Sequence, residues 1–261
     1  MAPVALIAKI SAPAISIKHP ETFQIAAALP LPQPSSLIGA LAYCLGAYTG
    51  IGLTALDRVK SLVLAARARL LSEIEVITPI ILRRFRILDK GFEKKGFLKA
   101  LEKLRSCDFE GFRNIIEGEL TDALYREYLS QTMFKCVWIV EGELDSRIAY
   151  LLQRLGDTES LVTVEETWSA ECSLEYADHV ETEYPFTVPR EKIEDMRGEY
   201  TIIRMCDEKR ERKMFYVPCR KSIRRTKSGV KYFVYQPTRM VAKFKEGLRV
   251  YRIENETIIV G

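Results

Sequence analysis

Basic side chains interleaved with aromatic rings occur in two segments of the sequence, a combination suited to binding single-stranded nucleic acid. Lys and Arg bind phosphates, and aromatic rings stack on unpaired bases. The first segment contains Arg83, Arg84, Phe85, Arg86, Lys90, Phe92, Lys94 and Lys95. The second contains Arg220, Lys221, Arg224, Arg225, Lys227 and Lys231, together with Tyr232 and Tyr235. Each cluster is more informative than any member, because a single charged side chain commonly only keeps the surface solvated.

One histidine has a position suited to metal-independent acid–base chemistry on RNA. His19 follows Lys18 at the end of the first predicted strand, whereas His179 lies in an acidic segment. A lone histidine is more often structural than catalytic. The sequence therefore predicts no catalytic residue, with His19 as the single candidate, and it predicts that Lys18 and His19 contact RNA.

Other enzyme classes have no signature in this chain. The sequence contains no Gly-x-Gly-x-x-Gly, Gly-x-x-x-x-Gly-Lys, Gly-x-Ser-x-Gly or His-Glu-x-x-His motif. Its six cysteines form no Cys-x-x-Cys pair and only two histidines are available, so we expect neither a zinc site nor a cofactor. The cysteines, with no recognisable leader before them, predict a reducing, cytoplasmic location.

Charge is unevenly distributed although the net charge is only +4. Residues 83–105 hold nine Lys/Arg against three Asp/Glu, and residues 220–252 hold eleven against one. Residues 157–199 reverse the balance, with thirteen acidic residues against three basic ones. The basic regions predict a polyanion-binding face. The acidic region is either a protein-binding surface or, as we favour, a solvated face.

The elements that must position these residues follow from hydrophobic periodicity. Strands are predicted over residues 4–17, 59–79 (one long or two short), 133–140 and 161–168, with helices over 35–48 and 145–155. The resulting order is strand, helix, strand, strand, helix, strand. This order predicts an α+β fold with a ferredoxin-like (RRM-like) βαββαβ domain over residues 1–168.

Two further parts of the chain are predicted in addition to these six elements. A basic insertion at about residues 83–131, with helical character in 97–104 and 121–129, lies between the second and third strands. Residues 169–261 hold short strands and predict a smaller β-rich C-terminal domain.

The segment from His19 to Gly46 combines a stiff linker with a helix start. Pro30, Pro32 and Pro34 hold the chain extended. Either Ser35 or Ser36 is then expected to cap the helix. Its apolar face contains Leu37, Ile38, Leu41 and Leu45, and Gly39, Ala40 and Ala42 leave room for close backbone approach.

This pattern resembles the fifth family of CRISPR-associated proteins, the small RAMP subunit of type I Cascade complexes. That family opens with a strand and a proline-rich turn that ends in Pro-Ser-Ser/Thr-Leu-hydrophobic-Gly, followed by a helix closing near Leu-Gly. The matching residues are Pro34, Ser35, Ser36, Leu37, Gly39, Leu45 and Gly46. A second block, residues 154–164, resembles the Arg-hydrophobic-Gly-x-x-Glu segment of the archaeal type I-A branch. The two blocks and the elements between them cover about two-thirds of the chain.

The resemblance implies an RNA-binding subunit that holds the 5′ handle of the crRNA in antiviral defence. It implies that the insertion is a "thumb" that grips the handle and a neighbouring backbone subunit, and that the C-terminal domain meets a partner. The expected partners are the crRNA handle and the backbone and large subunits of the complex. Ser35 and Ser36, at a helix N-terminus, are expected to bind a handle phosphate.

Two alternatives stay open. One is a metal-independent endoribonuclease acting on repeat RNA, although Gly229, Gly247 and Gly261 are isolated and form no glycine-rich loop of the kind found in such enzymes. The other is a scaffold subunit that meets RNA only through its partners.

A membrane span is a further reading of residues 37–56, which contain no charge over a length that would cross a bilayer. Gly39, Gly46, Gly50 and Gly52 interrupt this window. We therefore predict a helix, a turn and a loop there, and no membrane association.

Overall fold

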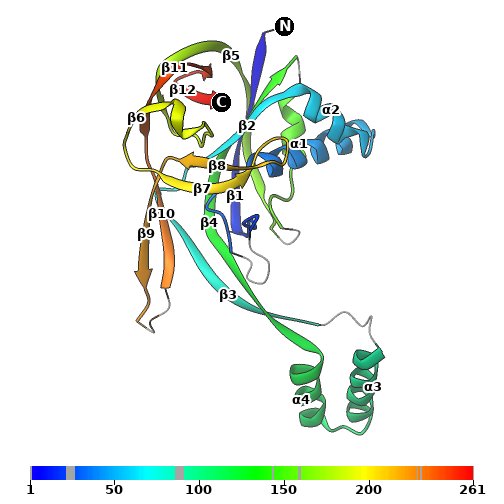
Figure 1. Cartoon of the computed structure of the whole chain (residues 1–261). Helices are drawn as coiled ribbons and strands as arrows, with labels where there is room; N and C mark the ends of the chain where they lie inside the picture. The colour runs from blue at the N-terminus through cyan, green and yellow to red at the C-terminus, as the bar shows by residue number, and fades with distance from the viewer. Residues whose placement is uncertain are drawn as a thin grey trace. The chain divides into compact units, whose positions relative to one another are not determined.

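The computed structural model describes residues 2–21, 27–85, 91–142, 144–157, 160–227, 229 and 231–260, without the side chains of residues 81–85, 91–94 and 122–125. The fold is mixed α/β, rich in strands, with a large sheet and few helices (Figure 1). Its first elements are β1 (Pro3–Ile15), α1 (Pro34–Thr49), α2 (Thr54–Leu62), β2 (Val63–Leu70), β3 (Glu75–Phe85), α3 (Gly91–Arg105), α4 (Phe109–Glu119), β4 (Thr121–Glu141), the 3-10 helix η1 (Ser146–Leu151) and β5 (Thr163–Thr182). The remaining elements are the 3-10 helix η2 (Arg190–Lys192), β6 (Ile193–Arg197), β7 (Thr201–Cys206), β8 (Arg212–Val217), β9 (Cys219–Arg225), β10 (Lys231–Pro237), β11 (Met240–Ile253) and β12 (Glu256–Val260).

The large sheet is organised around β1. Its strand order is β12-β11-β5-β1-β4-β3-β10-β9, with β2 also paired to β4 and β6 to β11, and β7 and β8 form a separate pair. On either side of β1, antiparallel pairing places Leu6 opposite Trp138 of β4 and Ser169 of β5. Apolar residues of β1 such as Leu6 and Ile10 are fully buried, as expected for a central strand.

Helix α1 begins earlier than a serine cap would allow. Pro34 is its first residue and Gln33 its N-cap. The Gln33 side-chain oxygen accepts a hydrogen bond from the Cys206 backbone N–H at 2.9 Å, not from the helix. Ser35 and Ser36 therefore lie inside the first turn, and the prediction that one of them is the cap is wrong. The fixed φ of proline suits the first helical position, so the helix starts there.

The predicted apolar face of α1 is confirmed, since Leu37, Ile38, Leu41 and Leu45 are buried. The Trp138 indole Nε1 of β4 donates to the Leu37 carbonyl at 3.0 Å and fixes the helix on the sheet. Gly50, with φ of 73°, ends α1 in the left-handed conformation, and its N–H bonds the Gly46 carbonyl at 2.9 Å. No helix in the described part of the chain combines the length and apolar character needed to cross a membrane.

Three predicted elements differ from the structure. The helix expected over 145–155 is only the 3-10 helix η1, because the chain after Leu151 turns extended and Gln153 accepts a bond from Val162 N–H. Residues 121–129 are strand, not helix, because they continue β4 along its partners in the sheet. The strand expected from residue 59 begins at Val63, after helix α2.

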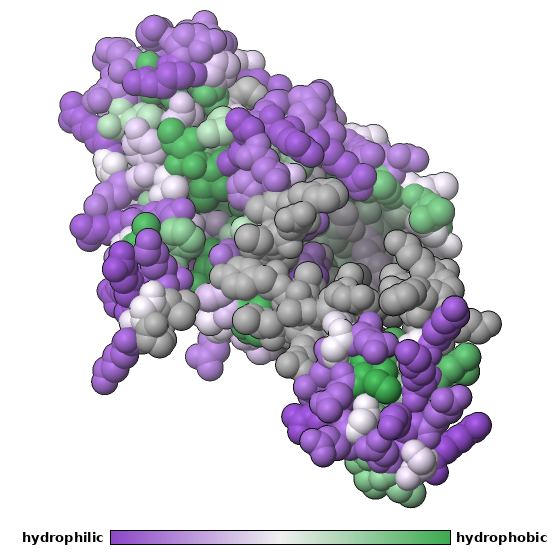
Figure 2. All heavy atoms as spheres, turned by 60° about the horizontal axis from the view of Figure 1, so that its bottom comes forward, coloured by the Kyte–Doolittle hydropathy of each residue, from purple (hydrophilic) through white to green (hydrophobic). Residues whose placement is uncertain are grey.

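The chain divides into two compact units, Met1–Thr78 with Glu127–Gly261, and Pro79–Arg126. The second unit holds α3 packed on α4, and the Asp108 carboxylate caps α4 by accepting from the Gly111 N–H at 2.9 Å. Hydrophilic side chains cover much of this helical pair, with apolar ones between them (Figure 2). The predicted domain boundary at 168/169 falls inside β5, and a division there stays a prediction.

Candidate functional site

The fold brings three distant segments of the first unit around one cavity of about 380 Å³. The segment that follows β1, the β7–β8 pair and the β9–β10 hairpin all contribute side chains. Its lining includes His19, Glu21, Leu29, Glu127, Ile202, Arg204, Met214, Lys221, Phe233 and Tyr235. The cavity thus joins the predicted His19 position to the second basic segment, and its size is within the range of small-ligand sites.

Backbone pairing holds the segment that carries Lys18 and His19. The Leu29 N–H donates to the Ile17 carbonyl at 2.7 Å, and the His19 N–H donates to the Ala27 carbonyl at 2.9 Å. The Glu127 carboxylate of β4 accepts from the Ala28 N–H at 2.9 Å. Lys18 is exposed and His19 is half-buried at the cavity.

The His19 imidazole favours its neutral form. Burial lowers the pKa of His19 below its usual 6.5, Arg204 and Lys221 lower the pKa further, and Glu21 opposes them. The Glu21 backbone N–H donates to His19 Nδ1 at 3.3 Å, so this nitrogen acts as an acceptor. At neutral pH the ring therefore brings no positive charge to the cavity.

The β9–β10 hairpin presents a lysine over aromatic rings. Lys221 is paired with Tyr235, and Ile223 with Phe233, so these side chains share one face of the hairpin. The Lys221 Nζ lies 4.1 Å from the centroid of the Phe233 ring and 5.6 Å from that of Tyr235. Cation–π contact therefore positions this ammonium group, which has no ion pair with a carboxylate of the described residues.

The rest of the second basic segment is exposed on the same hairpin, where hydrophilic side chains gather (Figure 2). The predicted RNA-binding residues here are Arg220, Arg224, Arg225 and Lys227. Arg220 pairs with Glu199 at 3.2 Å. Arg224, Arg225 and Lys227 have no ion pair with any described carboxylate, so three positive charges remain available to an anion.

The first basic segment belongs to the second unit. Arg83, Arg84 and Phe85 lie in β3, but their side chains are outside the described residues, as is the side chain of Lys94 and all of Arg86. Lys95 is exposed on α3. The predicted RNA contacts of this segment stay predictions.

The N-terminus of α1 offers few backbone donors to a phosphate. Pro34 has no N–H, and the Ser36 and Leu37 N–H groups both donate to the Gln33 carbonyl, at 2.9 and 3.2 Å. The Ser35 N–H and the two hydroxyls remain, on half-buried serines. A phosphate contact at Ser35 and Ser36 stays a prediction that depends mainly on these hydroxyls.

Sequence reasoning missed several lining residues of the His19 cavity. Arg204 and Met214 lie on β7 and β8, and Glu127 lies in a segment predicted to be helical. No motif surrounds them, and only the strand pairing brings them to His19. Lys221 and Tyr235 belong to the second basic segment, but nothing in the sequence places them near His19.

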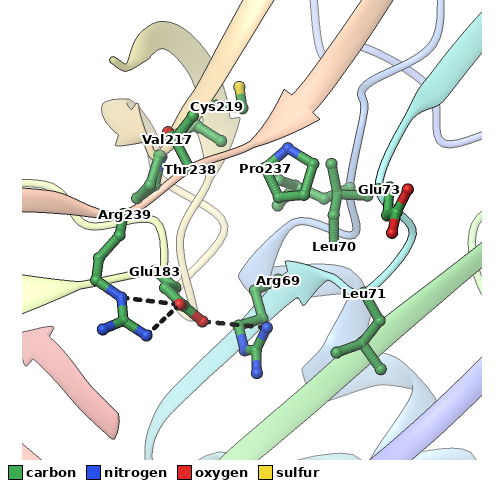
Figure 3. A pocket seen from close by; sticks show the side chains of 12 residues that line it. Arg69, Leu70, Leu71, Glu73, Glu183, Val217, Cys219, Pro237, Thr238 and Arg239 are labelled. Atoms are coloured by element: carbon green, nitrogen blue, oxygen red, sulfur yellow. Dashed lines mark hydrogen bonds and ion pairs between the residues drawn. The ribbon is translucent and has the colours of Figure 1, made fainter. Parts of the chain in front are cut away.

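A second cavity, of about 280 Å³, is lined by charges that neutralise one another (Figure 3). Glu183 lies between Arg239 and Arg69, with oxygen–nitrogen distances of 2.9 and 3.1 Å. Arg69 also pairs with Glu256 at 2.7 Å, and Glu256 pairs with Lys135 at 2.7 Å. These pairs join β2 and β4 to β12, to the residue after β5 and to the residue before β11, and they leave little net charge for an anion.

The described residues offer neither a clear metal-binding cluster nor a reactive thiol at Cys172 or Cys219. No group of three or more His, Cys, Asp or Glu side chains there is arranged to hold a metal ion. Burial raises the pKa of the Cys172 and Cys219 thiols to about 11, which keeps both protonated at neutral pH.

Comparison with known proteins shows which proteins the chain is similar to. No protein-family model matches it. A curated CRISPR-associated protein Cas5 from Thermoproteus tenax is 29% identical over 212 residues, which cover 79% of this chain and 81% of the relative. The crystal structure of a CRISPR protein from Archaeoglobus fulgidus superposes with a TM-score of 0.54 and 14% identity over 98% of each chain. A chain of a CRISPR RNA-guided surveillance complex aligns over 90% of both chains at 14% identity, with a TM-score of 0.38 that is too low to support a common fold.

The chain is therefore similar to CRISPR-associated proteins in sequence and in fold. Within this class it is homologous to Cas5, and the resemblance to the fifth family is confirmed. The type I-A branch stays a prediction.

Proposed function

We propose that this chain is a non-catalytic RNA-binding subunit of a type I CRISPR interference (Cascade) complex, in which it holds the 5′ handle of the crRNA in antiviral defence. The observation that carries the proposal is the convergence of the His19 segment and the basic β9–β10 hairpin on one cavity. The homology to Cas5 supports the same reading. The proposed partners are the crRNA handle and the backbone and large subunits of the complex.

In this proposal, two kinds of contact hold the RNA. Arg224, Arg225 and Lys227 bind phosphates, and this contribution weakens as the salt concentration rises, because the release of counterions from the RNA then gains less entropy. Lys221 and Phe233 receive a base or its phosphate at the cavity, where the ring and the ammonium are already held together.

We further propose that the core of the first unit is a reduced ferredoxin-like domain. The strands β5, β1, β4 and β2 are neighbours in this order, and the printed pairings between them are antiparallel. The helix α1 connects β1 towards β2, while η1 occupies the place of the second helix between β4 and β5.

The experiment is a titration of the purified chain against a labelled 5′-handle RNA and a scrambled RNA at two salt concentrations. Preference for the handle supports the proposal, and equal affinity for the two RNAs overturns it. Replacing Arg83, Arg84 and Arg86 by alanine tests the thumb separately. Weaker binding with a flatter salt dependence supports the thumb, whereas unchanged affinity and slope contradict it.

An endoribonuclease is the second candidate, favoured by the neutral imidazole of His19 beside the Lys221 ammonium in one cavity. A neutral imidazole can accept a proton from a ribose hydroxyl. Incubation with repeat RNA in EDTA distinguishes the candidates. The enzyme predicts a discrete product that His19→Ala abolishes, and the non-catalytic subunit predicts intact RNA. A scaffold predicts neither cleavage nor handle affinity by the isolated chain.

A further inference from the structure

The His19 cavity contains a carboxylate that phosphate binding does not explain. Glu127 of β4 lines this cavity, and one of its carboxylate oxygens accepts from the Ala28 N–H at 2.9 Å. No ion pair joins Glu127 to a basic residue in the described part of the chain. A carboxylate has about four acceptor sites, and the bond from Ala28 uses one of them. Because a carboxylate repels phosphate, Glu127 is suited to a ligand group that donates hydrogen bonds.

The other charges of the cavity lining differ in how far they are already neutralised. The carboxylate of Glu21 forms an ion pair with Arg204 of β7, so these two groups largely cancel. The imidazole of His19 favours its neutral form. Lys221, in contrast, lies over the Phe233 ring and has no ion pair with a described carboxylate. The cavity therefore offers an incoming molecule one ammonium donor and one carboxylate acceptor.

The donor and the acceptor both lie near one aromatic side chain, Tyr235. Lys221 is opposite Tyr235 in the β9–β10 pairing, and its Nζ lies 5.6 Å from the centroid of the tyrosine ring. Burial raises the pKa of the Tyr235 hydroxyl, and the charge of nearby Glu127 adds to the rise. A single planar ligand beside this ring is therefore placed to meet the ammonium and the carboxylate together.

Apolar side chains supply walls against which a flat ligand can pack. Ile202 of β7 is 49% exposed and Met214 of β8 is 45% exposed, and both line the cavity. Leu29 and the half-buried Phe233 line it as well. Aromatic rings and methionine sulfur pack well on the faces of nucleobases. Apolar walls with a few placed polar groups are the usual composition of a pocket that recognises a small planar group.

We infer that this cavity is a pocket for one unpaired guanine, and that Glu127 sets its specificity. The Watson–Crick edge of guanine presents the acceptor O6 and then two adjacent donors, N1–H and the N2 amino group. Lys221 donates to O6, which leaves ammonium donors for a phosphate, and the Glu127 carboxylate accepts from both guanine donors. In each of the other three bases the donor on this edge is next to an acceptor, which a carboxylate repels. The inference rests on the proposed function, because it requires that single-stranded RNA enters the cavity.

The first test is a titration of the purified, unmodified chain with labelled oligouridylate RNAs that carry one guanosine, inosine or adenosine at each position in turn. Inosine lacks only the N2 amino group of guanosine. At its best position, a single guanosine is expected to raise the affinity about tenfold over the all-uridine RNA, and inosine to lose most of that gain. Equal affinity for guanosine and inosine, no gain from guanosine, or no binding of any of these RNAs overturns the inference.

The second test compares two variants that each remove one negative charge from the cavity. Glu127→Gln keeps an oxygen for the Ala28 N–H and is expected to reduce the guanosine gain to less than twofold, without weakening the binding of the all-uridine RNA. Glu21→Gln is the matched control and should retain the whole gain. The same guanosine gain in both variants contradicts the role of Glu127, and the inosine comparison remains decisive if a variant fails to fold.

The handle RNA and a scrambled RNA of the same base composition are titrated alongside, which separates the two conclusions. Preference for the handle without a gain from guanosine overturns the guanine pocket and leaves the proposed function standing. A gain from guanosine without preference for the handle overturns the proposed function and supports the pocket.

Discussion

The Lys221 ammonium lies 4.1 Å from the centroid of the Phe233 ring, across the β9–β10 hairpin. The contact positions the charge at the cavity that His19 also lines. A lysine held by an aromatic ring keeps its full charge and its hydrogen-bond donors, in contrast to the arginines of the Glu183 network. This difference makes Lys221 the most informative position for mutation.

Lys221→Gln is expected to weaken binding of the handle RNA and to reduce the salt slope by about 0.7, the value for one phosphate contact on a single strand. The measurement is a titration of labelled RNA at several salt concentrations. Lys60→Gln, at an exposed lysine of α2, is the matched control and should leave affinity and slope unchanged. An equal loss in both variants would assign the effect to net charge alone.

His19 is expected to make the folded state sensitive to acid. Its pKa is lowered in the folded state, chiefly by burial, from the value near 6.5 expected when unfolded. The unfolded chain therefore binds more protons below pH 6.5, so the stabilisation is complete above pH 6.5 and is lost as the pH falls through the lowered value. Urea unfolding at pH 7.5, 6.5 and 5.5 should show a steeper loss for the wild type than for His19→Gln. Parallel pH profiles would contradict this prediction.

The buried ion pair between Arg67 of β2 and Glu208 after β7 is expected to matter most when one partner is removed. The Arg67 side chain is 3% exposed and that of Glu208 is 22% exposed. Glu208→Gln leaves the guanidinium buried without its carboxylate and should lower the free energy of unfolding by about 3 kcal/mol. The double variant Arg67→Met with Glu208→Gln should recover much of that loss. The free energy of unfolding is also measured for Arg67→Met alone. If the double variant loses as much as the two single variants together, the ion pair does not account for the loss in Glu208→Gln.

Two glycines with similar backbone angles give a matched pair of stability tests. Gly156 and Gly142 have φ of 93° and 96°, but only at Gly156 would a Cβ meet a backbone oxygen, that of Ser16, at 2.6 Å. Gly156→Ala should therefore cost about 1–3 kcal/mol more than Gly142→Ala, the difference being the steric clash. Thermal or urea unfolding of both variants measures this difference in the free energy of unfolding. Equal losses of stability would show that the loop containing Gly156 moves away from Ser16 at little cost.

The sequence predicted those parts of the fold in which local pattern and tertiary context agree. The apolar face of α1 and the interruption at Gly50 follow from periodicity and glycine chemistry, and both are confirmed. The helix predicted over 145–155 failed because apolar spacing cannot distinguish a helix from a 3-10 turn followed by buried extended chain, in which Leu152 and Leu155 are also buried. The strand at 121–129 could not be foreseen, since its conformation follows from pairing in the sheet.

The candidate site was predictable only in part. His19 and the second basic segment were found from residue type, but their meeting at one cavity depends on long-range strand pairing that no local signal encodes. Arg204 and Glu127 carried no signal, because charged residues on strands are common. The serine cap was excluded by Pro34, whose ring fixes the helix start one residue before Ser35.

The central position of β1 has a consequence for synthesis of the chain. Residues 3–15 are made well before their partners, which lie at 129–141 in β4 and at 163–171 in β5. At ~5–20 residues per second, this apolar strand waits on the order of ten seconds on the ribosome with both edges unpaired. Such non-local pairing makes folding slow and exposes the nascent chain to aggregation. Slower, cooler expression, or a chaperone that covers the first strand, should therefore raise the yield of folded protein.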